Sequence, residues 1–185
     1  MSESAGSGNM LSTASPLGAT TSWLRDSYGR VTERTDADGH SVSRSYDDLG
    51  RLAEIVDAAG STRSFVWNNN NTLASVTDGL GEITQFGYDA DRRRTSITDP
   101  TGRQVQYEYD GRDRLVTRTD PMGTEYFEWS ANNVMTAYER RNGDRNEVEI
   151  DAYDRPIRKT LAVGGDTTYL YDLAGRLIEA SNNTA

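Results

Sequence analysis

Cysteine is absent from this 185-residue sequence, and histidine occurs once, as His40. The lack of cysteine excludes disulfides, thiolate-bound zinc and thiol catalysis. A single histidine excludes a His-cluster metal site and argues against a Ser-His-Asp triad. No apolar run approaches the roughly 20 residues of a membrane helix. Residues 1–21 hold no basic stretch followed by an apolar one, so we expect no secretory signal peptide and interpret them as a flexible N-terminal lead.

Positive charge and apolar side chains are also scarce. The net charge is −9 and the sequence pI is about 4.6, which argues against nucleic acid as a partner because such binding needs a basic surface. Hydrophobic residues make up 35% of the chain, and the mean hydropathy is −0.75. What apolar surface there is lies in rings, with Tyr 10, Trp 3 and Phe 3. This composition favours a thin sheet over a thick two-layer core.

The sequence is a tandem repeat. Steps of 21 residues from an aromatic residue, which we call slot 1, return to a similar residue each time, with one step of 20 before Trp129. Slot 1 is filled by Tyr46, Trp67, Tyr88, Tyr109, Trp129, Ile150 and Tyr171, and Arg25 stands at this position in an opening unit. We therefore expect a repeat array over residues 22–181, with units starting near 25, 46, 67, 88, 109, 129, 150 and 171, and a tail over 182–185.

Two turn signals punctuate each unit. Slot 15 is glycine in every full unit: Gly39, Gly60, Gly81, Gly102, Gly123, Gly143 and Gly164. Slot 12 is aspartate in five of these units: Asp36, Asp57, Asp78, Asp99 and Asp120. Aspartate first and glycine fourth are typical of a type I turn. Slots 2 to 5 carry a second signal of the same kind, as in Asp47–Gly50.

Two turns in 21 residues leave two segments of strand length. The segment 104–109 alternates polar and apolar residues, which is typical of a half-buried strand. The residue two before slot 1, here called slot 20, is usually aromatic as well, so one sheet face carries most of the rings. The pattern predicts an all-β fold: tandem antiparallel β-hairpins forming a curved single-layer strip.

Slots 2 and 6 vary together. Six units combine aspartate in slot 2 with arginine in slot 6, as in Asp47 and Arg51, whereas units with Asn68 or Ser130 in slot 2 lack the arginine and carry tryptophan in slot 1. We infer an Asp–Arg pair that bridges the turn, replaced by a Trp/Asn arrangement in the other unit type. An exposed ion pair contributes little, so Arg51→Ala is expected to be far milder than Tyr46→Ala.

The repeated unit resembles the RHS/YD-repeat family. The resemblance rests on residues 46–52 (Tyr-Asp-x-x-Gly-Arg-Leu), 98–102 (Thr-Asp-Pro-x-Gly) and 171–177, and it covers about residues 22–181. It implies β-hairpins that spiral into a hollow shell. In bacterial polymorphic toxins such a shell encloses a C-terminal toxin, and in teneurins a related barrel serves cell adhesion. Eight units are too few to close a shell, so we expect a fragment, a truncated member or a piece that completes itself by association.

Catalysis has two candidate residues, Asp99 and Asp120. The resemblance implies that aspartates in paired Asp-Pro-x-Gly motifs carry autoproteolysis in RHS shells, and both motifs occur here. Two carboxylates could act as acid and base if repulsion kept one protonated. Both nevertheless stand in the register of an ordinary turn, and Thr124 stands where the family motif has leucine. We therefore expect no catalytic residue and no enzyme.

Two binding alternatives are weaker. Asp36-Ala37-Asp38-Gly39 is half of an acidic calcium loop, but the rest of that pattern is missing, so no metal or other cofactor is expected; His40 is interpreted as a surface turn residue. The aromatic ladder could bind a cell-surface glycan, although rings along hairpins more often pack the sheet itself.

The favoured function is structural: a segment of a shell that encapsulates a C-terminal toxin and helps to deliver it. The alternative is a carbohydrate- or cell-surface-binding adhesive module. The expected partners are toxin cargo or further RHS repeats of the same or a neighbouring chain. The expected location is secreted or on the cell surface, through a specialised secretion system.

Overall fold

The structure is a computed structural model that describes residues 11–14 and 20–183. These residues form seventeen β-strands and no helix, which confirms the all-β prediction. None of them belongs to a helix long and apolar enough to cross a membrane. The chain divides into two compact units, Met1–Phe86 and Gly87–Ala185.

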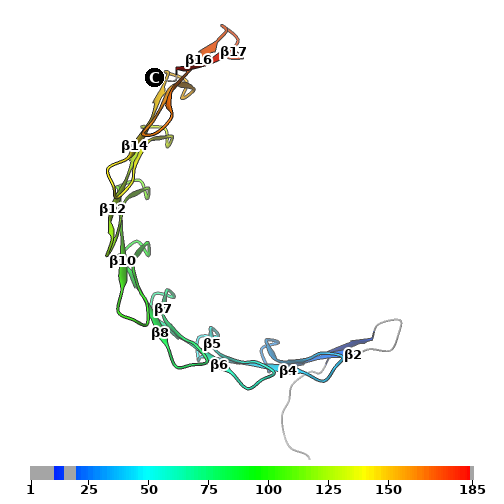
Figure 1. The fold of residues 1–185 in the computed structure, drawn as a ribbon. Helices are drawn as coiled ribbons and strands as arrows, with labels where there is room; N and C mark the ends of the chain where they lie inside the picture. Colours follow the sequence, from blue (N-terminus) through cyan, green and yellow to red (C-terminus); the bar gives the residue numbers. More distant parts are fainter. Residues whose placement is uncertain (1–10, 15–19, 184–185) are drawn as a thin grey trace, which may run out of the picture. The chain divides into compact units, whose positions relative to one another are not determined.

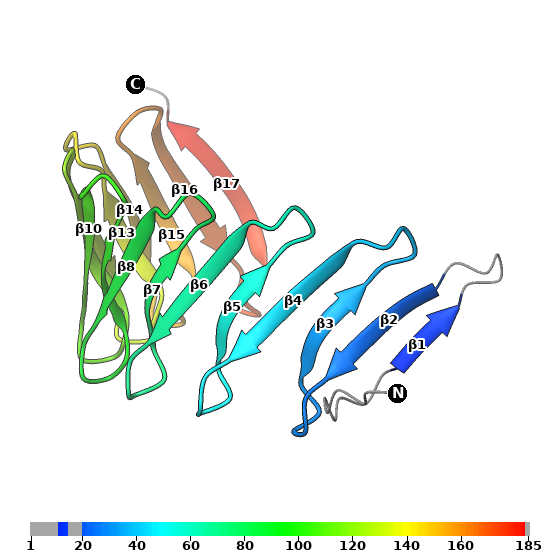
Figure 2. The same ribbon diagram turned by 90° about the horizontal axis from the view of Figure 1, so that it is seen from below.

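The first unit is a series of antiparallel strands in which each pairs with the next along the sequence (Figures 1 and 2). Its last strand, β8, runs on into the second unit. The strands are β1 (Leu11–Ala14), β2 (Thr20–Arg25), β3 (Val31–Thr35), β4 (Ser41–Tyr46), β5 (Leu52–Val56), β6 (Thr62–Trp67), β7 (Leu73–Thr77) and β8 (Ile83–Tyr88).

The second unit repeats the same plan, and its strands again pair antiparallel in sequence order. The strands are β9 (Arg94–Thr98), β10 (Gln104–Tyr109), β11 (Leu115–Asp120), β12 (Gly123–Trp129), β13 (Met135–Glu139), β14 (Arg145–Ile150), β15 (Pro156–Leu161), β16 (Gly165–Tyr171) and β17 (Leu177–Asn183).

The strands alternate with turns of one repeated design. In the turn after β4, the Gly50 N–H donates to the Asp47 carbonyl (2.8 Å) and the Asp47 N–H donates to the Arg51 carbonyl (2.8 Å). Gly50 has a φ of 81°, in the left-handed region that favours glycine. The Asp47 carboxylate accepts the N–H groups of Leu49 and Arg51, which explains why aspartate opens the turn.

Slot 5 shows the same backbone requirement where glycine is replaced. The left-handed conformation is then adopted by a non-glycine residue, and it is found at Asn71, Arg92, Asp113, Asn133 and Asp154. Four of these five are asparagine or aspartate, which tolerate this conformation better than other residues.

The single 20-residue step has a local cause. Asp120 and Gly123 pair directly across the end of β11 and β12, so this hairpin closes through Pro121 and Met122 alone. Other turns of the same kind keep the longer form; Asp36, for example, pairs its N–H with the carbonyl of His40. One residue is therefore lost within a turn, and the strands keep their register.

No conventional core exists among the described residues. Ala137, 4% exposed, is the one buried apolar residue, and no large side chain is fully buried. This confirms the thin-sheet prediction. Each strand presents alternate residues to opposite faces, and we call the face that carries slot 20 the ring face. Phe127 and Tyr138, directly opposite each other in β12 and β13, stack there with ring centroids 5.1 Å apart.

The strands extend slightly beyond the predicted array. Leu11–Ala14 pairs with β2 as strand β1, within the segment for which the sequence predicts a flexible lead. Strand β17 continues to Asn183, past the predicted end at residue 181. The remaining lead residues, 1–10 and 15–19, and residues 184–185 of the tail lie outside the described residues.

Candidate functional site

The slot-1 rings link each repeat to the one before it. The Tyr46 hydroxyl donates to the Val31 carbonyl (2.8 Å), 15 residues earlier, so the ring reaches the adjacent strand β3 of the preceding hairpin. Equivalent bonds join Trp67 to Leu52 (2.7 Å), Tyr109 to Arg94 (2.9 Å), Trp129 to Leu115 (2.8 Å) and Tyr171 to Pro156 (2.9 Å). A ring with a hydrogen-bond donor at its far end can make this bond, which explains why tyrosine and tryptophan are the usual residues in slot 1.

A bulge beside slot 1 produces this geometry. Ser45 pairs with Glu54, but Tyr46 pairs with Leu52, so Ala53 is left unpaired. The same shift occurs beside Trp67, Tyr109, Trp129 and Tyr171. A bulge changes the direction of the side chains next to it. Here it stands beside each ring that reaches the neighbouring hairpin.

The slot-6 arginines link the repeats in the other direction. Arg51 pairs with its own Asp47 (2.7 Å), as the sequence predicts. Its Nη1 also donates to the Asn68 carbonyl (2.7 Å) and to Asn71 Oδ1 (3.0 Å) of the next unit. Its guanidinium lies over the Trp67 ring, 5.7 Å from the centroid. The arginine therefore fixes two consecutive units, and it is not limited to the turn that the sequence reasoning assigned to it.

The same arginine link recurs from repeat to repeat in both compact units of the chain, Met1–Phe86 and Gly87–Ala185. Arg93 donates to the Asp110 carbonyl and to Asp113, and Arg114 donates to the Ser130 carbonyl and to Asn133. The distances from the guanidinium to the next slot-1 ring are 4.5 Å for Arg30–Tyr46, 5.2 Å for Arg93–Tyr109, 5.9 Å for Arg114–Trp129 and 4.6 Å for Arg155–Tyr171. A cation over a ring face is attracted by the ring's quadrupole.

The two tryptophan units fit the predicted Trp/Asn arrangement. The arginine that covers Trp67 or Trp129 comes from the preceding unit, and it also binds the asparagine in slot 5. Within the turn that follows Trp67, the Asn68 amide donates to the Thr72 hydroxyl (2.9 Å) in place of the Asp–Arg pair. The exchange of residue types therefore keeps each turn hydrogen-bonded.

Two repeats have no arginine in slot 6, which is Thr72 in one and Val134 in the other, and the second of them also precedes a unit without the rings. Val134 replaces the slot-6 arginine, and Ile150 and Val148 replace the rings of slots 1 and 20 in the unit that follows. A hollow of about 230 Å³ lies here, lined by Met135, Tyr138, Val148, Lys159 and Leu161 with three neighbouring residues. The ring ladder of the second unit is thus interrupted at one place.

The slot-2 aspartates are held in their ionised form. A hydrogen bond from the Arg114 side chain, aided by the N–H groups of Arg112 and Arg114, lowers the pKa of Asp110 to about 2. At Asp47, burial raises the pKa, but hydrogen bonds from Arg51 outweigh this effect and the pKa is lowered. These turns therefore carry paired charges, and the pKa of every slot-2 aspartate that pairs with a slot-6 arginine is lowered.

The two catalytic candidates occupy turns of different form. Asp99 accepts the Thr101 hydroxyl (2.7 Å), which lowers its pKa. The pKa of Asp120 is lowered by the Met122 N–H and by the charges of Arg141 and Arg118, whose side chains lie 3.1 and 3.3 Å away. A general acid requires a raised pKa. The geometry therefore favours the turn role for both aspartates.

The half calcium loop is also explained by its turn. Oxygen and nitrogen atoms of Asp36, Asp38 and His40 lie within 4.8 Å of one another. Asp36 Oδ1 already accepts the N–H groups of Asp38 (3.0 Å) and His40 (2.9 Å), and the Asp36 carboxylate lies 3.5 Å from His40 Nδ1. His40 thus has a partner within its own turn, which the sequence did not indicate.

Sequence reasoning missed the links that the arginines make between units. A signal for them exists in the sequence: asparagine or aspartate in slot 5 at Asn71, Asp113 and Asn133 follows a unit with arginine in slot 6. Where slot 5 is glycine, it affects the slot-6 arginine of the preceding repeat in another way. A Cβ on Gly50 would lie 3.0 Å from Arg30 Nη1, so glycine leaves room for that guanidinium.

Comparison with known proteins gives a consistent result. The family model described as Teneurin YD-shell matches residues 20–184. No curated protein matches the chain. The pore form of the Photorhabdus luminescens Tc holotoxin, with a TccC3 mutation, is similar at 19% identity and a TM-score of 0.52, over 88% of this chain and 9% of that one. The crystal structure of TcdB2-TccC3 is similar at 17% identity and a TM-score of 0.49, over 94% of this chain and 12% of that one.

Proposed function

Since the chain belongs to the teneurin YD-shell family, we propose that it forms part of the wall of a β shell that encloses a toxin polypeptide and helps to deliver it. The similar Tc holotoxin chain is a toxin component by its name, and this chain spans only 9% of its length. The cargo, the further repeats that would complete the wall, and export by a specialised secretion system all belong to this proposal.

The observation that carries the proposal is the repeat-to-repeat linkage in a sheet without a core. Where both residues are present, a hairpin is fixed to its neighbours by a ring in one direction and an arginine in the other, as Tyr46 and Arg51 show. Such an arrangement can be lengthened by adding units without changing any of them. A single layer built in this way suits a wall, because both of its faces remain available.

The same linkage argues against catalysis and against the adhesive alternative. The polar ends of the slot-1 rings are used inside the sheet, so these rings do not offer free hydroxyl or indole groups to a sugar. The pKa values of Asp110 and Asp120 are both lowered, which does not suit a general acid near neutral pH. Containment is therefore the function that these contacts support best.

Protease protection tests this proposal. The full natural gene product that contains this array is treated with trypsin, and digestion of any polypeptide joined to the array is followed by mass spectrometry. Protection of that polypeptide, lost in a variant with Tyr46→Ala and Tyr109→Ala, is the expected result. Digestion at the same rate in both proteins would overturn the enclosure proposal while leaving the fold intact.

A further inference from the structure

Three arginines on the ring face of the first unit lack a partner. Arg34, Arg44 and Arg63 make no ion pair or hydrogen bond through their side chains among the described residues, whereas Arg30 and Arg51 are paired with aspartates. The strand register places the three on one face. Arg34 lies opposite Trp23 and Val42.

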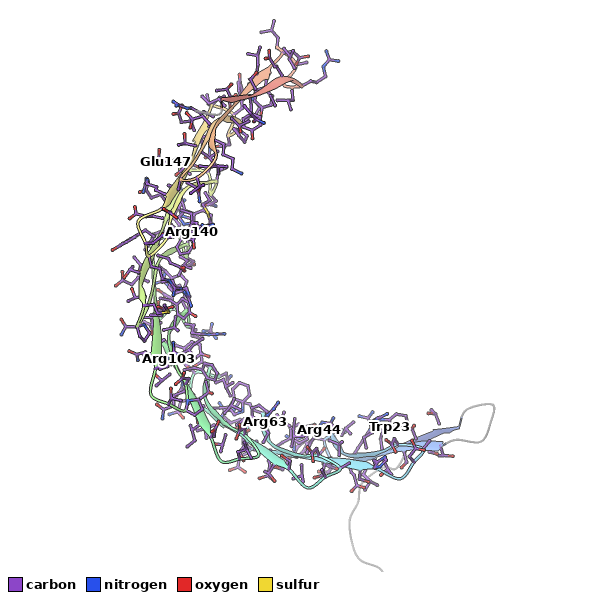
Figure 3. All side chains as sticks on the ribbon, viewed as in Figure 1. Trp23, Arg44, Arg63, Arg103, Arg140 and Glu147 are labelled. Carbon is purple, nitrogen blue, oxygen red and sulfur yellow. The ribbon has the colours of Figure 1, made fainter. Side chains whose placement is uncertain are left out.

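The register continues across the next strands. Arg44 follows Val42 by two residues on β4 and lies opposite Ile55 on β5, and Ile55 lies opposite Arg63 on β6. Figure 3 shows Trp23, Arg44 and Arg63 on the same side of the first unit's ribbon. We call Arg34, Arg44 and Arg63 the arginine strip.

Acidic residues of the same strands lie on the opposite face. Strands β2 to β7 contain two acids, Glu33 and Glu54. Glu33 lies opposite Ser43, and Glu54 lies opposite Ser45 and Ser64, all on the face away from the strip. The acid beside Arg63 is Asp57, at the end of β5, and its carboxylate accepts the N–H groups of Ala59 and Ser61 in its own turn. In a chain of net charge −9, the strip is therefore a local row of arginines that form no ion pair among the described residues, with the Asp57 carboxylate as the acid beside it.

The spacing of the strip fits an extended polypeptide. Arg34 and Arg44 are diagonal neighbours on adjacent strands, about 7–8 Å apart. Arg44 and Arg63 are two strands apart, about 10 Å. Alternate side chains of an extended chain repeat about every 7 Å. Apolar residues, Val42 and Ile55, stand between the arginines, and a hollow of about 180 Å³ lies beside Ile55 and Arg63.

We propose that the arginine strip binds an extended acidic polypeptide segment, in which glutamate or aspartate alternates with apolar residues. The carboxylates pair with the three guanidiniums, and the apolar residues contact Trp23, Val42 and Ile55. Arginine suits this role because its planar fork binds a carboxylate through two parallel hydrogen bonds. The proposal goes beyond enclosure, because the strip binds such a segment whether or not the wall closes.

A long polyanion fits the strip less well. The net charge of −9 repels nucleic acid over distances comparable to the Debye length, and three arginines are a small basic surface for a phosphate backbone. The apolar residues between the arginines have no counterpart in a sulfated sugar. A short segment with mixed acidic and apolar side chains satisfies both features of the strip.

Fluorescence anisotropy with the full chain tests the proposal. The probe is a fluorescein-labelled peptide, Gly-Ser-Glu-Leu-Glu-Leu-Glu-Ser-Gly, and its matched control has glutamine in place of glutamate. We expect saturable binding of the glutamate peptide that weakens with added salt, and at least about tenfold weaker binding of the glutamine peptide.

Two triple variants separate the strip from net charge. Arg34→Gln with Arg44→Gln and Arg63→Gln removes the strip; Arg92→Gln with Arg103→Gln and Arg140→Gln changes net charge equally at exposed positions in or beside turns. The first is expected to lose about tenfold or more in affinity and the second less than about twofold. Equal losses in both variants, or no binding by the unmodified chain, would overturn the proposal. So would tighter, strip-dependent binding of heparin or single-stranded DNA. Circular dichroism establishes that both variants remain folded.

Discussion

Removal of Arg51 tests the linkage between repeats. Arg51→Ala eliminates the hydrogen bonds to the Asn68 carbonyl and to Asn71, and the contact over the Trp67 ring. The side chain is 18% exposed, so these contacts are partly shielded from water. Two such hydrogen bonds contribute about 1 kcal/mol each, and the cation–ring contact contributes about 0.5 kcal/mol.

The expected loss is therefore about 2.5 kcal/mol from contacts with the next unit alone. For a chain of this length, it corresponds to a fall in Tm of about 5–10 °C. Tyr46→Ala, which loses a half-buried ring and its bond to Val31, is expected to cost about 3 kcal/mol. The sequence alone suggests that Arg51→Ala costs far less stability than Tyr46→Ala. The structure predicts a smaller difference between the two losses, because Arg51 also binds the neighbouring repeat.

Thermal unfolding followed by circular dichroism measures both losses, and tryptophan fluorescence reports on the environment of Trp67. Arg140→Ala, at an exposed turn position, is the matched control and is expected to change Tm by less than about 2 °C. Arg51→Lys keeps the charge but not the fork, so an intermediate loss is expected. If Arg51→Ala unfolds at the same temperature as Arg140→Ala, the interpretation of Arg51 as a link between repeats is wrong.

Three further outcomes follow from individual positions. Ile150→Tyr places a ring over the hollow beside Met135, as Tyr171 does at Pro156, and is expected to raise stability by about 1 kcal/mol in thermal unfolding. The pKa of Asp110 is about 2 in the folded chain, against an ordinary 3.8. The ionised carboxylate therefore stabilises the fold fully above pH 3.8, and this stabilisation is lost as the pH falls towards 2. Tm is expected to fall between pH 4 and pH 2. Gly102→Ala is expected to cost about 1–2 kcal/mol in urea unfolding because Gly102 has a φ of 85° with open space around it, whereas Gly102→Asn is expected to be milder.

Each outcome has its own control. Ile150→Phe supplies the ring without the hydroxyl and is expected to raise Tm by less than Ile150→Tyr. A lower Tm for Ile150→Tyr than for the unmodified chain would show that the hollow beside Met135 has no room for a slot-1 ring. Asp110→Asn is expected to flatten the acid dependence, and a Tm that stays constant from pH 4 to pH 2 would show that the aspartate pairs do not stabilise the fold. Equal costs for alanine and asparagine at Gly102 would refute the backbone explanation.

The turns and the ring face could be predicted from the sequence because each is set by local chemistry. Aspartate in the first turn position and glycine at a left-handed position act within five residues, as Asp47 and Gly50 do. The period of two in residues 104–109 predicts strand β10 in the same way. Repetition strengthened both signals, since the same residues recur at the same spacing in unit after unit.

The links between repeats could not be predicted from the same pattern. The reach of Arg51 to Asn68 depends on how one hairpin lies against the next, which is the register of β5 with β6, and on the bulge at Ala53 beside the turn that carries Arg51. A bulge leaves no distinctive residue type at this position. The pairing of Asp47 with Arg51 could be predicted because the two residues are four apart in the sequence. The contacts that the same guanidinium makes with the next repeat left no comparable local signal.

The arginine strip was also absent from the sequence reasoning. Glu33 and Arg34 are adjacent in the sequence, so the charges cancel in any window that covers both. In a strand they point to opposite faces, and only the pairing of β3 with β2 and β4 shows that Arg34 stands beside Trp23 and Val42. The strand register must therefore be known before the charges can be assigned to one face of the sheet or the other.

Electron cryomicroscopy of the full natural gene product that contains this array tests the central proposal most directly. The account predicts a closed hollow shell in which β1–β17 form one stretch of the wall and additional density for a polypeptide lies inside. An open strip with both faces in solvent and no enclosed density would contradict it.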